Sequence, residues 1–201
     1  MIRVLLADDE NLIRAALATM LDLEDDIEIV GQADSGEKAL TAAASLSPDV
    51  AVLDLQMGGI DGIETAQKIA ETLPDCASII VTSHGRPGYL KKALEAGVRG
   101  FLPKTTSAAT LAEVVRTVHG GGRYVDPTLA AEAIGAGDSP LTPREADVLE
   151  FAADGASIAE IARRAHLSPG TTRNYLSAAA AKLGAANRHE ACALARRHGW
   201  I

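Results

Sequence analysis

Short apolar runs alternate with amphipathic stretches through residues 1–119, and this alternation restricts the fold more than any other feature of the chain. Runs such as residues 50–53 and 79–81 are apolar throughout, as expected for parallel strands that are covered on both faces. Strands are expected at residues 2–7, 27–33, 50–54, 78–82 and 100–102, with helices near residues 11–23, 36–46, 62–73, 88–95 and 108–118. Five successive strand–helix units predict an α/β fold, a doubly wound five-stranded parallel sheet with right-handed crossovers.

A triple glycine at residues 120–122 ends this alternation. We expect residues 120–140 to form a linker that contains one short helix, from Asp126-Pro127 to Ile134. The expected divisions of the chain are therefore residues 1–119, 120–140 and 141–201.

Charge is divided near the same boundary. Residues 1–138 carry 21 acidic and 11 basic side chains, a net of −10, whereas residues 139–201 carry 6 and 8, a net of +2. An acidic first part and a mildly basic second part indicate two modules with different partners.

The second part contains four helix starts within sixty residues. Each begins with a side chain that can cap the first turn, and three of them also have glutamate three positions later. They are Thr142-Pro143-Arg144-Glu145, Ser157-Ile158-Ala159-Glu160, Ser168-Pro169 and Asn187-Arg188-His189-Glu190. This pattern predicts a compact, all-α, four-helix domain.

Composition restricts the setting of the protein. Of its 201 residues, 47% are hydrophobic and 23% are charged, which favours packed cores over global disorder. The apolar runs are shorter than the ~20 residues that a membrane helix needs, and the first residues lack the layout of a signal peptide. Cys76 and Cys192 are too few for a disulfide framework or a zinc site. We expect a soluble cytoplasmic protein with no membrane partner.

Acidic and polar side chains follow several of the predicted strands. Asp8 and Asp9 follow the first strand, Asp54 ends the third, Thr82 ends the fourth and Lys104 follows the fifth. Ligands of doubly wound sheets bind at the carboxyl ends of the strands, where these side chains are expected to meet. Carboxylates this close repel each other unless a cation is present, and an all-oxygen cluster suits Mg²⁺.

These residues lie within motifs that resemble a known family. The motifs are Leu6-Ala7-Asp8-Asp9-Glu10, Val52-Leu53-Asp54-Leu55-Gln56-Met57, Ile60-Asp61-Gly62, Val81-Thr82-Ser83 and Gly100-Phe101-Leu102-Pro103-Lys104. With the C-terminal motif described below, the chain resembles a two-component response regulator of the NarL/FixJ family over essentially its whole length. The resemblance implies a flavodoxin-like receiver domain in which Asp54 accepts a phosphoryl group from a sensor histidine kinase. It also implies that Mg²⁺ is held by Asp8, Asp9, Asp54 and the backbone carbonyl of Gln56.

The same resemblance assigns the remaining polar residues of the sheet edge. Thr82 and Lys104 are expected to contact the phosphoryl oxygens, and Phe101 to change position together with Thr82. Gly58 departs from the pattern, because the family commonly has proline there; glycine loosens the loop after Asp54 without removing a chemical group.

The alternative function is that of an enzyme, because some enzymes also form a phosphorylated aspartate. Haloacid-dehalogenase-type phosphatases also form this intermediate, but they place a second acid two positions after the nucleophile. That position is Gln56 here. We therefore expect a phosphoryl acceptor and switch, not an enzyme with turnover.

Residues 141–184 resemble the LuxR-type helix-turn-helix, with helices expected at 158–165 and 169–183. One face of the second of these helices is apolar, and the opposite face includes Arg173, Asn174 and Ser177. Arginine and asparagine suit guanine and adenine edges in the major groove, and the first half of a recognition helix is the part that enters it. Thr171 and Lys182 at the flanks are candidates for phosphate contacts.

A net charge of only +2 predicts weak DNA binding by one copy of this domain. We expect a homodimer on activation, which places two domains on one operator. The last helix, near residues 188–198, has a stripe of Ala191, Leu194 and Ala195 that suits a dimer surface and core packing equally. A phosphorylation-controlled transcription factor is the favoured function; a DNA-binding protein with a degenerate receiver and a receiver acting only through protein contacts are the alternatives.

Overall fold

The computed structural model describes residues 1–83, 87–135 and 139–201. The chain forms two compact units, which divide after Pro127, with the described residues 87–89 grouped with the second. Residues 136–138 of the expected linker lie outside the described residues. Residues 120–127 of the expected linker are grouped with the first unit.

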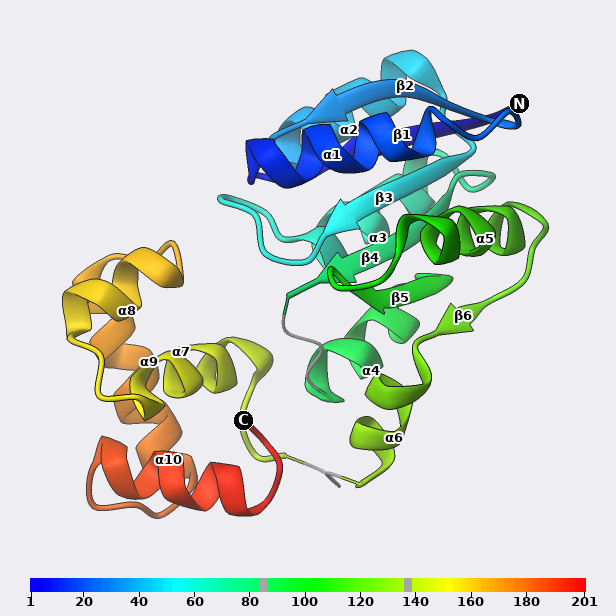
Figure 1. Ribbon diagram of the computed structural model, residues 1–201. Helices are drawn as coiled ribbons and strands as arrows, with labels where there is room; N and C mark the ends of the chain where they lie inside the picture. Colours follow the sequence, from blue (N-terminus) through cyan, green and yellow to red (C-terminus); the bar gives the residue numbers. More distant parts are fainter. Residues whose placement is uncertain (84–86, 136–138) are drawn as a thin grey trace. The chain divides into compact units, whose positions relative to one another are not determined.

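The first unit is built on a parallel sheet (Figure 1), which confirms the α/β prediction. Its strands are β1 (Ile2–Ala7), β2 (Ile27–Ala33), β3 (Val50–Asp54), β4 (Ala77–Thr82), β5 (Gly100–Pro103) and β6 (Tyr124–Val125). The helices among them are α1 (Asn11–Leu21), α2 (Gly36–Leu46), α3 (Gly62–Thr72), α4 (Pro87–Glu95) and α5 (Ala108–His119). Helices α1 and α5 cover one face of the sheet, and α2 and α3 cover the other.

The sheet has six strands, not the expected five. Strand β6 pairs in parallel with β5, with Tyr124 opposite Gly100 and Val125 opposite Phe101. Two residues are too few to show a strand periodicity, and the glycines before them indicated a linker. Part of the expected linker is therefore an edge strand of the sheet.

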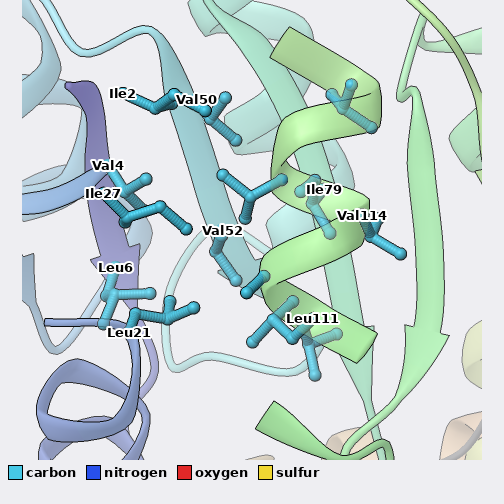
Figure 2. Close-up of a cluster of buried hydrophobic side chains, with 14 of the residues drawn as sticks. Ile2, Val4, Leu6, Leu21, Ile27, Val50, Val52, Ile79, Leu111 and Val114 are labelled. Atoms are coloured by element: carbon cyan, nitrogen blue, oxygen red, sulfur yellow. The ribbon is translucent and has the colours of Figure 1, made fainter. Parts of the chain in front are cut away.

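Alternate residues of the central strands form the core on the α1 and α5 face (Figure 2). Val4 and Leu6 of β1, Val52 of β3 and Ile79 of β4 belong to this core, and Val114 of α5 joins it near Ile79. All five are at most 3% exposed. Because the opposite face of the same strands is also buried, the sequence shows continuous apolar runs instead of alternation.

The strand order β2-β1-β3-β4-β5-β6 determines where the polar strand ends meet. Strand β1 lies between β2 and β3, so the chain leaves β1 toward one side and later continues on the other. The carboxyl ends of β1 and β3 are therefore neighbours at a topological switch point, where doubly wound sheets bind ligands.

The second unit is helical. The helices after β6 are α6 (Pro127–Gly135), α7 (Pro143–Ala153), α8 (Ile158–Arg164), α9 (Pro169–Lys182) and α10 (Arg188–Arg197). The predicted N-caps are confirmed: the side chains of Thr142, Ser157, Ser168 and Asn187 each accept a backbone hydrogen bond from the first turn. At α7 the capping box is complete, because Glu145 also accepts from the backbone of Thr142.

The core of this unit contains Val148, Leu149, Ile161, Ala179 and Ala191, all fully buried. Ala195 is also fully buried, so Ala191 and Ala195 of the predicted stripe on α10 pack into the core of their own domain, whereas Leu194 is half-buried. Among the described residues, no helix combines the length and apolar character that a bilayer crossing requires.

Candidate functional site

The acidic residues at the carboxyl ends of β1 and β3 meet at one edge of the sheet. Asp8 is 4% exposed and Asp54 is 5% exposed. One carboxylate oxygen from each of Asp8, Asp9 and Asp54 lies within 4.8 Å of the others. The predicted cluster of three carboxylates is present, and two of the three are withdrawn from water.

Lys104 lies among these carboxylates. Its ammonium is 2.9 Å from Asp8 Oδ2, 3.0 Å from Asp54 Oδ2 and 2.9 Å from Glu10 Oε1. Its side chain is only 8% exposed. The backbone of Lys104 is held at this edge because its N–H donates a hydrogen bond to the carbonyl oxygen of Thr82 at the end of the adjacent strand, at 2.8 Å.

Burial and the charge of Lys104 have opposite effects on the pKa of Asp54. Burial raises the pKa of Asp54 to about 7; the charge of Lys104 opposes this rise, and the charge of Asp8 adds to it. For Lys104, burial disfavours the ammonium, but hydrogen bonds to Asp8 and Glu10 and the charge of Asp54 outweigh it and raise the pKa. One cation among four carboxylates leaves an excess of negative charge that a divalent cation would offset.

Thr82 and Phe101 occupy one side of the sheet near this cluster. Phe101 is opposite Ile80 in the β4–β5 register, and Thr82 is two residues after Ile80, so both point to the same face. Thr82 is 1% exposed and Phe101 is fully buried. The backbone of Gln56 lies at the same edge, where it donates a hydrogen bond to the Asp54 carboxylate.

Two residues of this site were not predicted. Glu10 pairs with Lys104, although only its position beside Asp8 and Asp9 in the sequence hinted at such a role. Arg14, one turn into α1, donates from its guanidinium to the carbonyl oxygen of Asp8. With Asp8 and Asp54, Arg14 also lines a cavity of about 10 Å³, room for about one water.

The start of α3 packs directly on the backbone of Asp54. A Cβ added to Gly62 would stand 2.2 Å from the carbonyl oxygen of Asp54, and the backbone N–H of Gly62 donates to Leu55 at 3.0 Å. By contrast, a Cβ on Gly58 would have no atom within 4 Å. Only glycine permits this approach of α3, whereas Gly58 is not required by sterics.

In the second unit, α9 has the two faces that the sequence predicts. Thr172, Leu176 and Ala179 are buried in the domain core, and Arg173 and Asn174 are exposed. Thr171, Ser177 and Lys182 are exposed as well. The hydroxyl of Thr171 lies 2.8 Å from the capping hydroxyl of Ser168.

Lys182 has a partner within its own domain. Its ammonium lies 2.7 Å from Glu145 Oε2, and the Glu145 side chain is 7% exposed. Burial raises the pKa of Glu145, but hydrogen bonds from Lys182 and Thr142 outweigh this effect and lower it. The expected phosphate contact of Lys182 therefore competes with an ion pair that joins α7 to α9, a pairing that helical periodicity alone does not reveal.

Both units match known families. Residues 4–116 match the family described as response regulator receiver domain. Residues 139–195 match the family described as bacterial regulatory proteins, luxR family. The chain belongs to the response regulators.

Relatives of this response regulator match it over its whole length. It is 39% identical over 201 residues to the transcriptional regulatory protein DesR of Bacillus subtilis (strain 168), which covers all of both chains. It is 36% identical over 202 residues to the transcriptional regulatory protein UhpA of Escherichia coli (strain K12), again covering all of both. The crystal structure of response regulator ChrA, from a heme-sensing two-component system, is 31% identical with a TM-score of 0.58, covering 100% of this chain and 98% of that one.

The pairing of these two families defines the class of protein. This response regulator is a DNA-binding regulator of transcription with a receiver domain and a LuxR-type helix-turn-helix domain. Its families and relatives are response regulators and transcription factors, not enzymes.

Proposed function

We propose that this response regulator is switched by phosphorylation of Asp54. A sensor histidine kinase supplies the phosphoryl group, Mg²⁺ assists its transfer, and the phosphorylated chain forms a homodimer that binds an operator in double-stranded DNA. Because it regulates transcription, we expect it to act in the cytoplasm, where bacterial DNA lies. The observation that carries the proposal is the buried Asp54 carboxylate with Lys104 at 3.0 Å and two further aspartates beside it.

The donor set at the sheet edge suits Mg²⁺. Carboxylate oxygens of three aspartates lie within 4.8 Å of one another, and hard oxygen ligands are those that Mg²⁺ prefers. We assign the ion to Asp8, Asp9, Asp54 and the backbone carbonyl of Gln56. When bound, Mg²⁺ would neutralise negative charge on the phosphoryl group during its transfer.

Asp54 is the nucleophile in the proposed reaction. One of its carboxylate oxygens bonds to phosphorus while the bond from phosphorus to the histidine nitrogen of the kinase breaks, and that bonding electron pair stays on the nitrogen. Lys104 contributes positive charge next to Asp54, which stabilises the charge spread over the phosphoryl oxygens. Transfer of this kind needs positioning and charge neutralisation more than further covalent chemistry.

The phosphoryl group then acts on Thr82. It adds negative charge and strong hydrogen-bond acceptors beside Asp54, which the Thr82 hydroxyl can reach as a donor. Because Thr82 and Phe101 share one face of the sheet, a shift of Thr82 frees space for Phe101. Phosphorylation thereby favours one of two conformers, and only the favoured conformer dimerises.

DNA is read by α9 in this proposal. Arg173 and Asn174 contact base edges in the major groove, Ser177 lies on the same exposed face, and Thr171 contacts phosphate. The support is their exposure on the helix face opposite the buried Thr172. Dimerisation compensates for the net charge of only +2 on residues 139–201, since it binds two domains to one operator.

Phosphorylation is tested by labelling with a small phosphodonor. The wild-type chain should be labelled only when Mg²⁺ is present, and Asp54→Asn should abolish the label. Asp61→Asn is a matched control, because Asp61 is also an aspartate of this region but caps α3. Equal labelling of Asp54→Asn and wild type would show that the acceptor is another residue.

Coupling to DNA is tested by sedimentation and operator titration, each with and without phosphodonor. Phosphorylated protein should have the mass of a dimer and a higher operator affinity. Thr82→Ala should still be phosphorylated but should gain less affinity. If phosphorylated and unmodified chains have the same mass and the same operator affinity, the coupling is wrong.

A further inference from the structure

The loop between β3 and α3 connects the phosphoacceptor to the next helix. It runs from Leu55 to Asp61 and contains Gly58 and Gly59 in succession. Gly59 has a left-handed backbone, with φ of 86°, and Gly58 has no neighbour that would contact a Cβ. Two glycines give this loop more conformational freedom than other residues would, and every contact that restrains it therefore matters.

The ends of the loop are tied to Asp54. At the near end, the backbone of Gln56 donates to the Asp54 carboxylate. At the far end, Gly62 packs on the Asp54 carbonyl oxygen, and Asp61 caps α3 by accepting from the N–H of Glu64. Motion in the middle of the loop would therefore be transmitted to the atoms that surround the acceptor.

The middle of the loop is held by the first turn of α2. Glu37 Oε1 accepts a hydrogen bond from the backbone N–H of Ile60 at 3.2 Å. The same carboxylate lies against Gly59, because a Cβ there would stand 2.4 Å from Glu37 Oε1. Gly36 adds a second contact, since a Cβ on it would stand 2.8 Å from the carbonyl oxygen of Ile60.

We propose that Glu37 is a positioning residue for the phosphoacceptor site, which it acts on by holding the Gly58-Gly59 loop through the backbone of Ile60. The inference rests on the proposed function, since the site it positions is the one that binds Mg²⁺ and the phosphoryl group. Hydrogen bonds from its own backbone and from Ile60 lower the pKa of Glu37, in agreement with this contact.

Gly58 offers a second way to restrain the loop. A Cβ there would have no atom within 4 Å, so a larger residue would reduce the backbone freedom of the loop without a clash. Stiffening the loop at Gly58 should therefore substitute for Glu37.

The test is an Mg²⁺ titration of the full chain followed by amide NMR, together with hydrogen exchange at the Ile60 amide. Glu37→Ala should speed exchange at Ile60 and raise the Kd for Mg²⁺ about tenfold, the lower end of the effect of residues that orient metal ligands. Glu37→Gln keeps an oxygen acceptor for Ile60 and should remain within about twofold of wild type. Glu64→Ala removes another first-turn glutamate, whose side chain pairs with Lys68 at 2.7 Å, and should leave the Kd unchanged.

A second variant tests the mechanism independently. Gly58→Ala should restore most of the Mg²⁺ affinity that Glu37→Ala loses, while changing little in the wild-type background. A wild-type Kd in Glu37→Ala, equal losses in Glu37→Gln and Glu37→Ala, or no restoration by Gly58→Ala would each overturn the inference. A wild-type chain that binds no Mg²⁺ would overturn the proposed function as well, so the two failures are distinguishable.

Discussion

Gly62→Ala should damage the first unit more than its small size suggests. The added Cβ would stand 2.2 Å from the carbonyl oxygen of Asp54 and 3.2 Å from Ile80 Cδ1. Ordinary contacts between heavy atoms lie near ~3.5 Å, so strand β3 and helix α3 must separate by about 1 Å. The closest atom belongs to backbone, and no rotamer change relieves the clash.

The energetic effect follows from two terms. Forcing extra volume into a packed contact costs about 1–3 kcal/mol. A shift of about 1 Å would also stretch the hydrogen bond from Gly62 to Leu55 beyond hydrogen-bonding distance, which adds about 1 kcal/mol. We expect Gly62→Ala to lower the free energy of unfolding of the first unit by about 2–4 kcal/mol.

Urea unfolding separates the two units spectroscopically. The chain has one tryptophan, Trp200, which belongs to the second unit, so its fluorescence follows that unit alone while far-UV circular dichroism follows both. Gly62→Ala should shift the dichroism transition and leave the fluorescence transition in place. Gly58→Ala, with open space for its Cβ, should be neutral or stabilising by up to about 1 kcal/mol. A Gly62→Ala variant within about 1 kcal/mol of wild type, with normal phosphodonor labelling, would refute this reasoning.

Three further predictions use the same unfolding measurements. The first concerns Asp54, whose pKa in the folded protein is raised to about 7 from the ordinary value of 3.8, so that its ionisation destabilises the wild-type fold as pH rises. In EDTA, the free energy of unfolding of Asp54→Asn should therefore increase by about 2 kcal/mol relative to that of wild type between about pH 5 and about pH 7. Equal pH dependence of the two proteins would contradict this. Ser47 caps the end of α2 with a φ of 46°, in the left-handed region that favours glycine, so Ser47→Gly should stabilise the first unit by about 1 kcal/mol. Ser45→Gly, inside the helix, should destabilise it by about 0.5 kcal/mol. Effects of the same sign would contradict this backbone argument. Lys182→Ala should destabilise the second unit by about 1–2 kcal/mol near neutral pH and by less below about pH 4. The reason is that the pKa of Glu145 is lowered in the folded protein, so the stability from its ion pair with Lys182 is lost when Glu145 is protonated. A loss of stability that is independent of pH would exclude the ion pair as its cause.

The sequence predicted the acidic site well because its residues follow recognisable strands. Asp8, Asp9 and Asp54 come directly after apolar runs, and in a parallel sheet such positions necessarily share an edge. Thr82 and Lys104 follow the same rule. Side chains that approach from elsewhere carry no such signal.

Contacts between elements account for what the sequence did not predict. Glu37 reaches the loop after Asp54 from a helix 23 residues earlier, which no periodicity reports. Lys182 was expected to contact phosphate because it lies on an exposed helix end, yet its ammonium pairs with Glu145 from α7. The two-residue strand β6 was missed because its pairing depends on β5 and not on its own pattern.

The two edges of the sheet limit how copies of this chain can associate. At one edge, β6 offers only Tyr124 and Val125 for pairing. At the other, the register between β1 and β2 shifts at Val4/Leu5, and the exposed residues of β2 include Glu28 and Gln32. Short edges, bulges and polar side chains oppose the addition of a foreign strand, a common route to aggregation. If receiver domains pair as proposed, we therefore expect the contact to form through helical faces, with the sheet edges resisting strand exchange between copies.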